Sequence, residues 1–372
     1  MSQTTFRGRF PLPSHSRPVG EPGPGARRST YPTRKAREYH HPKPWRTTID
    51  PLGTTAPVPP PAHRTTRPVH CASRIPTRRI TDELTHGADP GPATPPPSLT
   101  LPTGRAIPQL GFGTYKIAPT DAYDAVSRAL DAGYRHIDTA QMYGNEAEVG
   151  RAIEASGIPR EELFVTSKLD NGNHRPEAAA ASIARSLEDL RLASLDLFLV
   201  HWPLPTRYDG DVALPWPALE DAYRAGECLA IGLSNYETTH MRAVMDRAAV
   251  KPHAIQVESH PYMPNSTILR FAQRHRMVFE AWSPLARGRA PRDPLLASIG
   301  ARYGAGAAQV ALRWAIQRGH VVFPKSVRPD RMAANFDVFG FELAPADMDA
   351  INALNEGEKG RTGSHPATMD RM

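Results

Sequence analysis

The sequence is poor in cysteine and has no long apolar run, and each absence excludes a class of protein. Its 372 residues include two cysteines, Cys71 and Cys228, which are too few for a disulfide framework and are typical of a reducing cytoplasm. No apolar stretch reaches the ~18 residues of a membrane span, so we expect no membrane partner. There is also no CxxC motif or His/Cys cluster, so we expect no metal site.

Charge and proline are concentrated in residues 1–98. This quarter contains 20 of the 39 prolines, and its 15 Lys and Arg against 6 Asp and Glu give it a net charge of +9. The remaining residues carry 30 basic and 32 acidic side chains, a net of −2. The segment has few large apolar residues and no sustained period, so it cannot bury enough surface to offset chain entropy. We therefore expect a disordered, basic, Pro/Arg-rich N-terminal extension.

The role of this extension stays open at the level of sequence. It has no apolar segment long enough for a secretory signal, and its prolines interrupt the amphipathic helix of a transit peptide. A basic tail can contact nucleic acid, but scattered arginines and prolines are more typical of a solvated tail, so we expect no nucleic-acid partner. A translation start later in the chain is a third alternative.

Residues 99–372 alternate between short apolar runs and amphipathic helical stretches. A two-stranded hairpin with Thr103-Gly104 at its turn comes first. Several of the strands that follow are rich in apolar and β-branched residues, as in a parallel sheet buried on both faces. Repetition of eight strand–helix units predicts a (β/α)8 TIM barrel, with a doubly wound open sheet as the alternative. The eight predicted strands are 111–116, 136–140, 163–169, 196–202, 229–235, 254–259, 278–285 and 321–327.

Three helical signals lie between these strands. The first helix is predicted to start with Thr120 as its cap and to stop at Gly133. A long amphipathic helix is predicted over 175–192. The string GAGAAQ at 304–309 lacks the third glycine of a dinucleotide-binding fingerprint and follows no strand, so we interpret it as a loop that opens a helix.

Polar side chains recur where the predicted strands end. In a TIM barrel the active site lies at the carboxyl ends of the strands, so these residues are expected to converge. A run of polar residues at the exits of buried strands is hard to explain as core. They are Asp138, Lys168, His201, Ser234, Asn235, Glu258, Ser283 and Lys325.

Four residues together suggest carbonyl chemistry: Asp138, Tyr143, Lys168 and His201. A carbonyl that accepts hydride at carbon needs a proton at oxygen, and a tyrosine can supply it. A nearby ammonium lowers the pKa of the tyrosine, and a carboxylate can hold that ammonium in place. A neutral histidine can donate to the developing oxyanion. Any one of these residues alone would be read as surface, cap or core.

Several motifs in this order and spacing resemble the aldo-keto reductase superfamily. They are GYRHIDTAQMYGNEAEVGRAI, FVTSKL, LVHWPLP, IGLSNY, AWSPLARG and FPKSVRPDRM. The resemblance covers about 100–365 and is closest to bacterial members related to 2,5-diketogluconate reductases. It implies a (β/α)8 barrel that binds NADPH in an extended form without a Rossmann domain. It also implies that Asp138, Tyr143, Lys168 and His201 form the catalytic tetrad.

The same resemblance implies a set of NADPH-binding residues. Lys325 and Arg331 together suit a phosphate bound from two sides. The implied contacts are Ser234, Asn235 and Gln256 with the carboxamide, Trp282 stacked on the nicotinamide, Ser283 and Leu285 at the pyrophosphate, Lys325, Ser326, Val327 and Arg331 at the 2′-phosphate, and Asn335 at the adenine.

Three positions depart from the family pattern. Ala334 replaces a glutamate expected to help hold the adenine, Ile255 replaces an asparagine before Gln256, and Asp170 replaces an aromatic residue in a substrate loop. The last change indicates a more polar pocket. We therefore expect an NADPH-dependent reductase of aldehydes or ketones, such as small dicarbonyls or keto-sugars. The alternative is a non-catalytic member of the fold, which the complete tetrad disfavours. A monomer is the default expectation.

Overall fold

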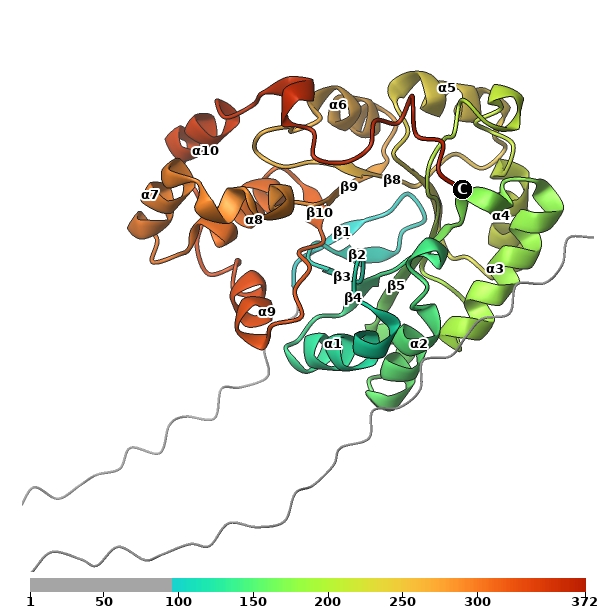
Figure 1. Ribbon diagram of the computed structural model, residues 1–372, viewed down its shortest axis with the longest axis horizontal. Coiled ribbons are helices and arrows are strands. Elements are labelled where there is room, and N and C mark those ends of the chain that lie inside the picture. The colour runs from blue at the N-terminus through green and yellow to red at the C-terminus, as the bar shows by residue number, and fades with distance from the viewer. Residues whose placement is uncertain (1–95) are drawn as a thin grey trace, which may run out of the picture. The chain divides into compact units, whose positions relative to one another are not determined.

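The computed structural model describes residues 96–372, which are coloured in Figure 1. The expected N-terminal extension, apart from its last three residues, lies outside the described residues. The first element, β1 (Ser98–Thr100), pairs antiparallel with β2 (Ala106–Pro108), as the sequence predicts for the hairpin. Within residues 96–372, no helix is both long enough and apolar enough to cross a membrane.

Eight parallel strands follow in sequence order, each paired with the next. The last returns to the first, because Val322 N–H donates to the Gln109 carbonyl at 2.8 Å and the Val322 carbonyl accepts from Gly111 N–H at 2.9 Å. This closure confirms the barrel and rules out the open sheet. The strands are β3 (Phe112–Gly113), β4 (His136–Asp138), β5 (Phe164–Leu169), β6 (Leu197–Val200), β7 (Ile231–Ser234), β8 (Ala254–Glu258), β9 (Val278–Trp282) and β10 (His320–Val322).

Helices surround the strands on the outside (Figure 1). One follows each strand, with α7 inserted before α8 and α10 added after α9. The helices are α1 (Pro119–Asp131), α2 (Glu146–Ala155), α3 (Pro176–Leu190), α4 (Trp216–Ala225), α5 (Thr238–Arg247), α6 (Ser266–Arg274), α7 (Pro294–Arg302), α8 (Ala307–Gln317), α9 (Pro329–Phe336) and α10 (Pro345–Asn352).

The start of α1 corrects one expectation. Thr120 does not cap the helix, because α1 begins at Pro119 with Ala118 in the N-cap position. Proline at the first helical position already has a helical φ and no N–H to satisfy, so a capping oxygen is less needed there. The Thr120 hydroxyl instead donates to Asp121. The helix does stop before Gly133, whose φ of +100° suits glycine.

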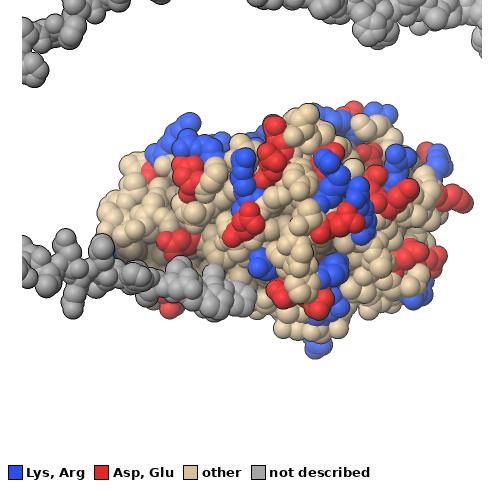
Figure 2. Space-filling model, turned by 90° about the horizontal axis from the view of Figure 1, so that it is seen from below, with Lys and Arg blue, Asp and Glu red and all other residues tan. Residues whose placement is uncertain are grey.

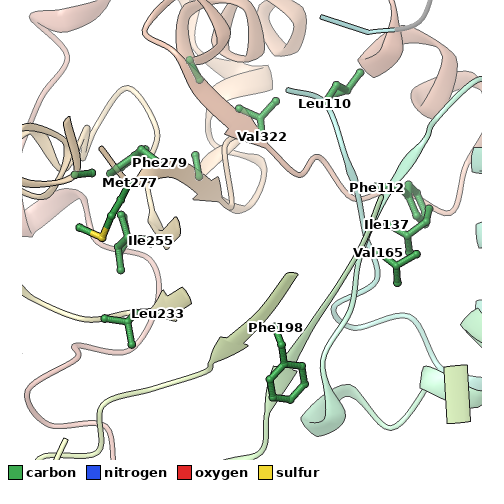
Figure 3. Packing of buried hydrophobic residues seen from close by; sticks show 14 of the residues in the cluster. Leu110, Phe112, Ile137, Val165, Phe198, Leu233, Ile255, Met277, Phe279 and Val322 are labelled. Atoms are coloured by element: carbon green, nitrogen blue, oxygen red, sulfur yellow. The ribbon is translucent and has the colours of Figure 1, made fainter. Parts of the chain in front are cut away.

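Alternate strand residues point outward and pack against the helices. Figure 3 shows this row, in which Phe112, Ile137, Val165, Phe198 and Leu233 come from five consecutive strands. All five are fully buried. Because side chains alternate along a strand, the residues on either side of this row point into the barrel.

The amino end of the barrel interior is apolar and is covered by the hairpin. Leu101 and Ile107 of the hairpin pack on the inward residues of the strands that surround them. Arg105 of the hairpin also bonds the buried Asp196 at 2.8 Å, and Arg160 bonds the same carboxylate at 2.6 Å. The apolar layer consists of Phe164, Leu197, Leu199, Ala230, Ala254, Val278, Val321 and Phe323. This end is filled, which leaves the carboxyl end for a site.

The outer surface carries both charges. Figure 2 shows basic and acidic side chains interspersed over one face of the described residues. Several exposed charges of the barrel pair across adjacent helices and loops, as Arg191 does with Glu154 and Arg247 with Asp211. Such exposed pairs contribute at most about 1 kcal/mol each, so the barrel depends on its interior for stability.

Candidate active site

Lys168 lies at the centre of the polar end of the barrel. It is the fifth residue of β5, its side chain is fully buried, and its ammonium donates to Asp138 Oδ1 at 2.7 Å and to the Thr139 carbonyl at 2.8 Å. Burial alone would lower the pKa of Lys168, but the charge and hydrogen bond of Asp138, together with Tyr143 and Glu280, outweigh burial and raise that pKa. Lys168 is therefore a fixed cation.

Tyr143 provides the third acceptor for this ammonium. It ends the short 3-10 turn Gln141–Tyr143 that follows β4, and its Oη lies 3.5 Å from Lys168 Nζ. Burial raises the pKa of Tyr143 to about 12, although Lys168 by itself lowers it. Lys168 therefore does lower the pKa of Tyr143, as the sequence predicts, but the effect of burial is larger. The phenol stays protonated at neutral pH, as an acid must.

His201 approaches Tyr143 from the next strand. It follows β6 directly, and its ring centroid lies 5.7 Å from that of Tyr143 in an edge-on arrangement. Burial, together with the positive charge of Lys168, holds the pKa of His201 well below its usual value. The imidazole is therefore neutral and can donate one N–H. The structure thus brings together all four residues that the sequence singled out for catalysis.

Asn235 and Trp282 form a second polar group beside this cluster. Asn235 follows Ser234, the last residue of β7, and its amide donates to the His201 carbonyl at 2.9 Å and to Ser234 Oγ at 3.0 Å. The Trp282 indole N–H donates to Asn235 Oδ1 at 2.8 Å. Gln256, from the middle of β8, donates to Asp138 Oδ2 at 2.8 Å. The residues expected around a nicotinamide are therefore linked to the tetrad by hydrogen bonds.

The loop after β9 has an unusual backbone. Ser283, Ala286 and Arg287 all have φ near +50°, which is uncommon outside glycine. Residues 286–289 and 292–294 line an open cleft of about 470 Å³ that includes the arginines of this loop. Ser283 and Leu285, the expected pyrophosphate contacts, are both half-buried at its beginning. Arg287 and Arg292 give this cleft side-chain donors that can bind an anion.

Two cations lie free beyond the end of β10. Lys325 in the loop and Arg331 in the first turn of α9 are both exposed. Within the part of the chain that the structure describes, neither forms an ion pair, whereas Arg328 pairs with Asp330 at 2.6 Å. Ser326 is buried between them, Val327 is exposed, and Asn335 is buried on α9. The donor set fits a phosphate.

The carboxyl-terminal segment, residues 361–372, crosses this end of the barrel and is bonded to it. Glu258, at the end of β8, accepts from Thr362 N–H at 2.7 Å and Gly363 N–H at 3.0 Å, and a Cβ at Gly363 would collide with the ring of Trp282. Further on, Met369 packs on Trp202, next to His201. Figure 1 shows the segment crossing from the side of α10 toward α4.

The far end of this segment is fastened to the loops after β5 and β6. The carbonyl of Arg371 accepts from Asn171 at 2.7 Å, and Asp370 pairs with Arg207 at 3.7 Å. Asp170, which we expected in a substrate loop, accepts from Gly172 N–H and caps the short turn after it. The carboxyl-terminal segment therefore joins the end of β8 to two loops at the mouth of the barrel.

Sequence reasoning missed several buried polar residues of this region. Glu280 lies fully buried in β9, and His174, stacked on Tyr208 at 5.0 Å, has no partner for either ring nitrogen among the described residues. A charged residue in the middle of the apolar string VFEAW was a usable signal for Glu280. His174 lies in a loop, where no periodic pattern exposes an unusual residue.

Comparison with known proteins agrees with this geometry. The profile described as "Aldo/keto reductase family" matches residues 109–356, which is more than half of the chain. The chain belongs to the aldo/keto reductase family. Enzymes of this family reduce carbonyl groups with NADPH, so the protein is an NADP-dependent oxidoreductase.

Individual aldo/keto reductases match almost over their whole length. Glyoxal reductase of Bacillus subtilis is 40% identical over 270 residues, covering 72% of this chain and 96% of the relative. A crystal structure of a Gox0644 variant in complex with NADPH has a TM-score of 0.70 at 35% identity, covering 74% of this chain and 99% of that one. A structure described as a candidate 2,5-diketo-D-gluconic acid reductase B has a TM-score of 0.68 at 40% identity, covering 71% and 94%.

Proposed function

We propose that the protein reduces an aldehyde or ketone to the alcohol with NADPH and that Tyr143 gives the proton to the carbonyl oxygen. One observation supports this assignment above the others: Lys168 Nζ contacts both Asp138 Oδ1 and Tyr143 Oη at the carboxyl end of a closed barrel. When bound, NADPH supplies the hydride. The proton must come from the chain, and Tyr143 is a protonated phenol beside a fixed cation.

The neighbours of Tyr143 explain how it can release that proton. As the phenol O–H is transferred, negative charge develops on its oxygen, and the Lys168 ammonium at 3.5 Å stabilises that charge. Asp138 and the Thr139 carbonyl keep Lys168 in place. General acid catalysis of this kind contributes typically ~10²–10⁴-fold.

His201 has a separate role in the proposal. Because its imidazole is neutral, it can donate an N–H to the substrate oxygen without adding a charge that would repel Lys168. Its ring lies edge-on to that of Tyr143 at 5.7 Å, which supports a shared role for the two residues at the substrate oxygen. We propose that they bind the carbonyl oxygen together.

The cofactor is proposed to lie across the carboxyl ends of β7 to β10. The proposed nicotinamide contacts are Ser234, Asn235, Gln256 and Trp282, which the structure links to one another or to the tetrad. Ser283 and Leu285 are proposed at the pyrophosphate, and Asn335 at the adenine. The NADPH complex of the Gox0644 variant, which shares this fold, supports the choice of cofactor.

The adenosine 2′-phosphate is proposed to bind between Lys325 and Arg331, with Ser326 and Val327 beside it. Both cations lack a carboxylate partner in the described part of the chain, so no internal ion pair has to break on binding. A charge-assisted contact contributes about 1.5–3 kcal/mol. NAD has a hydroxyl group at this position, so NADPH should be preferred.

The proposed substrates are small dicarbonyls or keto-sugars. The loop after β5 carries the half-buried Asp170 where the family often has an aromatic residue, which makes this loop more polar. Two of the similar proteins carry names of this kind, a glyoxal reductase and a candidate 2,5-diketo-D-gluconic acid reductase B. A polar lining favours substrates with a second oxygen over simple alkyl aldehydes.

The experiment that tests this function follows NADPH oxidation by the purified protein over a panel of substrates. The panel contains glyoxal, methylglyoxal, a diketogluconate and alkyl aldehydes of matched size. Turnover should be highest with the dicarbonyls and keto-sugars. Absence of turnover with every carbonyl would contradict the reductase, and a preference for alkyl aldehydes would contradict the substrate class alone.

A further inference from the structure

A buried carboxyl group lies directly beneath the tetrad without a catalytic assignment. Glu280, in the middle of β9, is 0% exposed, and the alternation of side chains points it into the barrel. Its Oε2 accepts from Gln256 Nε2 at 3.2 Å, and its Oε1 has no partner among the described residues. Burial of a carboxyl group with one oxygen unpaired costs free energy, so its presence here suggests a function.

Gln256 connects this carboxyl group to the catalytic cluster. The same Nε2 that donates to Glu280 also donates to Asp138 Oδ2 at 2.8 Å. An amide nitrogen has two hydrogens, so both are used. The other end of the amide, Oε1, has no donor within residues 96–372, and it is not among the buried atoms that lack a partner. This oxygen is therefore left for a ligand.

We propose that Glu280 is a positioning residue that, together with Asp138, fixes the orientation of the Gln256 amide so that Oε1 faces the nicotinamide carboxamide. This inference rests on the proposed function, since it uses the proposed cofactor position. An amide can turn over about its last torsion, which exchanges its donor and acceptor ends. With carboxyl groups at two places around the nitrogen, only one orientation satisfies them. A carboxamide NH₂ then finds an acceptor and not a competing donor.

The charge of Glu280 adds a second, measurable property. Burial, and then the negative charge of Asp138, raise the pKa of Glu280 to about 8, against the opposing effects of Gln256 and Lys168. Asp138 from β4 and Lys168 from β5 are the charged groups that face it. His136, in the same strand as Asp138, is neutral because burial lowers its pKa to about 3. Glu280 is therefore mostly neutral at pH 7 and anionic above pH 8.

This titration should distinguish the two forms of the cofactor. The nicotinamide ring is positive in NADP⁺ and neutral in NADPH, so an anionic Glu280 beside Gln256 attracts only the oxidised form. As pH rises through 8, NADP⁺ should bind more tightly relative to NADPH. We expect the ratio of the two dissociation constants to change by roughly 5- to 30-fold, the range for opposite charges at intermediate effective dielectric.

The test measures binding of NADPH and NADP⁺ by fluorescence titration from pH 6.5 to 9.5, with no substrate present. Glu280→Gln should keep normal NADPH binding at pH 7, because its amide oxygen still accepts from Gln256, but it should lose the pH-dependent ratio. Glu280→Leu removes the acceptor and should weaken NADPH binding by about 10-fold. Rescue of binding by glutamine but not leucine separates positioning from packing.

Glu146→Gln is the matched control. Glu146 is also a buried carboxyl group whose pKa burial raises, but it accepts from Ser167 and Ser186 and does not contact Gln256. This variant should keep the wild-type ratio at every pH. A wild-type ratio that does not change between pH 7 and 9.5, or a folded Glu280→Leu variant with normal binding, would overturn the inference. Neither result affects the assignment of Tyr143, which has its own test.

Discussion

The two ends of the barrel interior both contain buried side chains but differ in their chemistry. At the amino end, Leu101 and Ile107 of the hairpin cover an apolar layer, and burial of that surface favours folding by ~25 cal/mol per Å². At the carboxyl end, Asp138, Lys168 and Glu280 are buried as polar groups, which costs desolvation free energy. The amino end stabilises the fold. The carboxyl end lowers that stability but holds the site residues in a fixed arrangement.

Tyr143→Phe should give the largest effect, because it removes the proposed proton from the polar end and nothing else. We expect turnover to fall by ~10³-fold or more, while the dissociation constant for NADPH and the melting temperature stay unchanged. Steady-state kinetics together with fluorescence titration measure both quantities. Near-normal turnover would exclude Tyr143 as the acid.

Ile107→Ala, at the amino end of the barrel, should lower stability without lowering activity. The side chain is fully buried in the hairpin, so its truncation should cost about 2–4 kcal/mol of unfolding free energy. At a temperature where the variant is folded, its kcat/KM should equal that of the wild type. Denaturant unfolding and kinetics check the two halves of this expectation. A marked loss of kcat would show that the two ends are coupled.

Arg331→Ala should change cofactor choice at the rim of the polar end. We expect KM for NADPH to rise by about 10- to 100-fold, while KM for NADH hardly changes, because only NADPH carries the 2′-phosphate. Arg328→Ala is a suitable control, since Arg328 is already paired with Asp330. Equal losses for both cofactors in Arg331→Ala would remove Arg331 from the 2′-phosphate site.

Glu280→Gln should also alter the pH dependence of stability. The folded pKa of Glu280, about 8, lies above its unfolded value of ~4.3, so the folded state holds the proton more tightly. Wild-type stability should therefore fall, relative to the variant, as pH rises from about 4.3 to 8. At about 1.4 kcal/mol per pKa unit, the difference should reach a few kcal/mol across this range. Melting temperatures of the wild type and the variant, measured from pH 4 to 9, check this expectation. A constant difference between the two proteins across that range would contradict it.

Removal of the chain before about residue 95 should have the smallest effect. We propose residues 99–372 as the catalytic unit, and the shortened protein keeps the hydrogen bond from Gln109 N–H to the Pro97 carbonyl. Melting temperature and kcat/KM should both match those of the full chain. A loss of several degrees would show that the removed residues stabilise the barrel.

The sequence predicted the features that repeat. All eight strands were predicted in order, and the tetrad was found because Asp138, Lys168 and His201 each follow or end an apolar run. Features that depend on one local geometry were missed. Thr120 has the right chemistry for a cap, but Pro119 starts the helix first. The net pKa of Tyr143 depends on burial, which a list of charged neighbours does not include.

The attachment of Thr362 and Gly363 to Glu258 has a practical consequence for redesign of this enzyme. Residues 364–372 reach the loops after β5 and β6 from a joint that is fixed to the barrel. A graft that exchanges only 364–372 keeps that joint and delivers a new sequence to the same place above the mouth. A graft that begins before Thr362 loses the hydrogen bonds to Glu258, so the grafted segment would no longer be held near those loops.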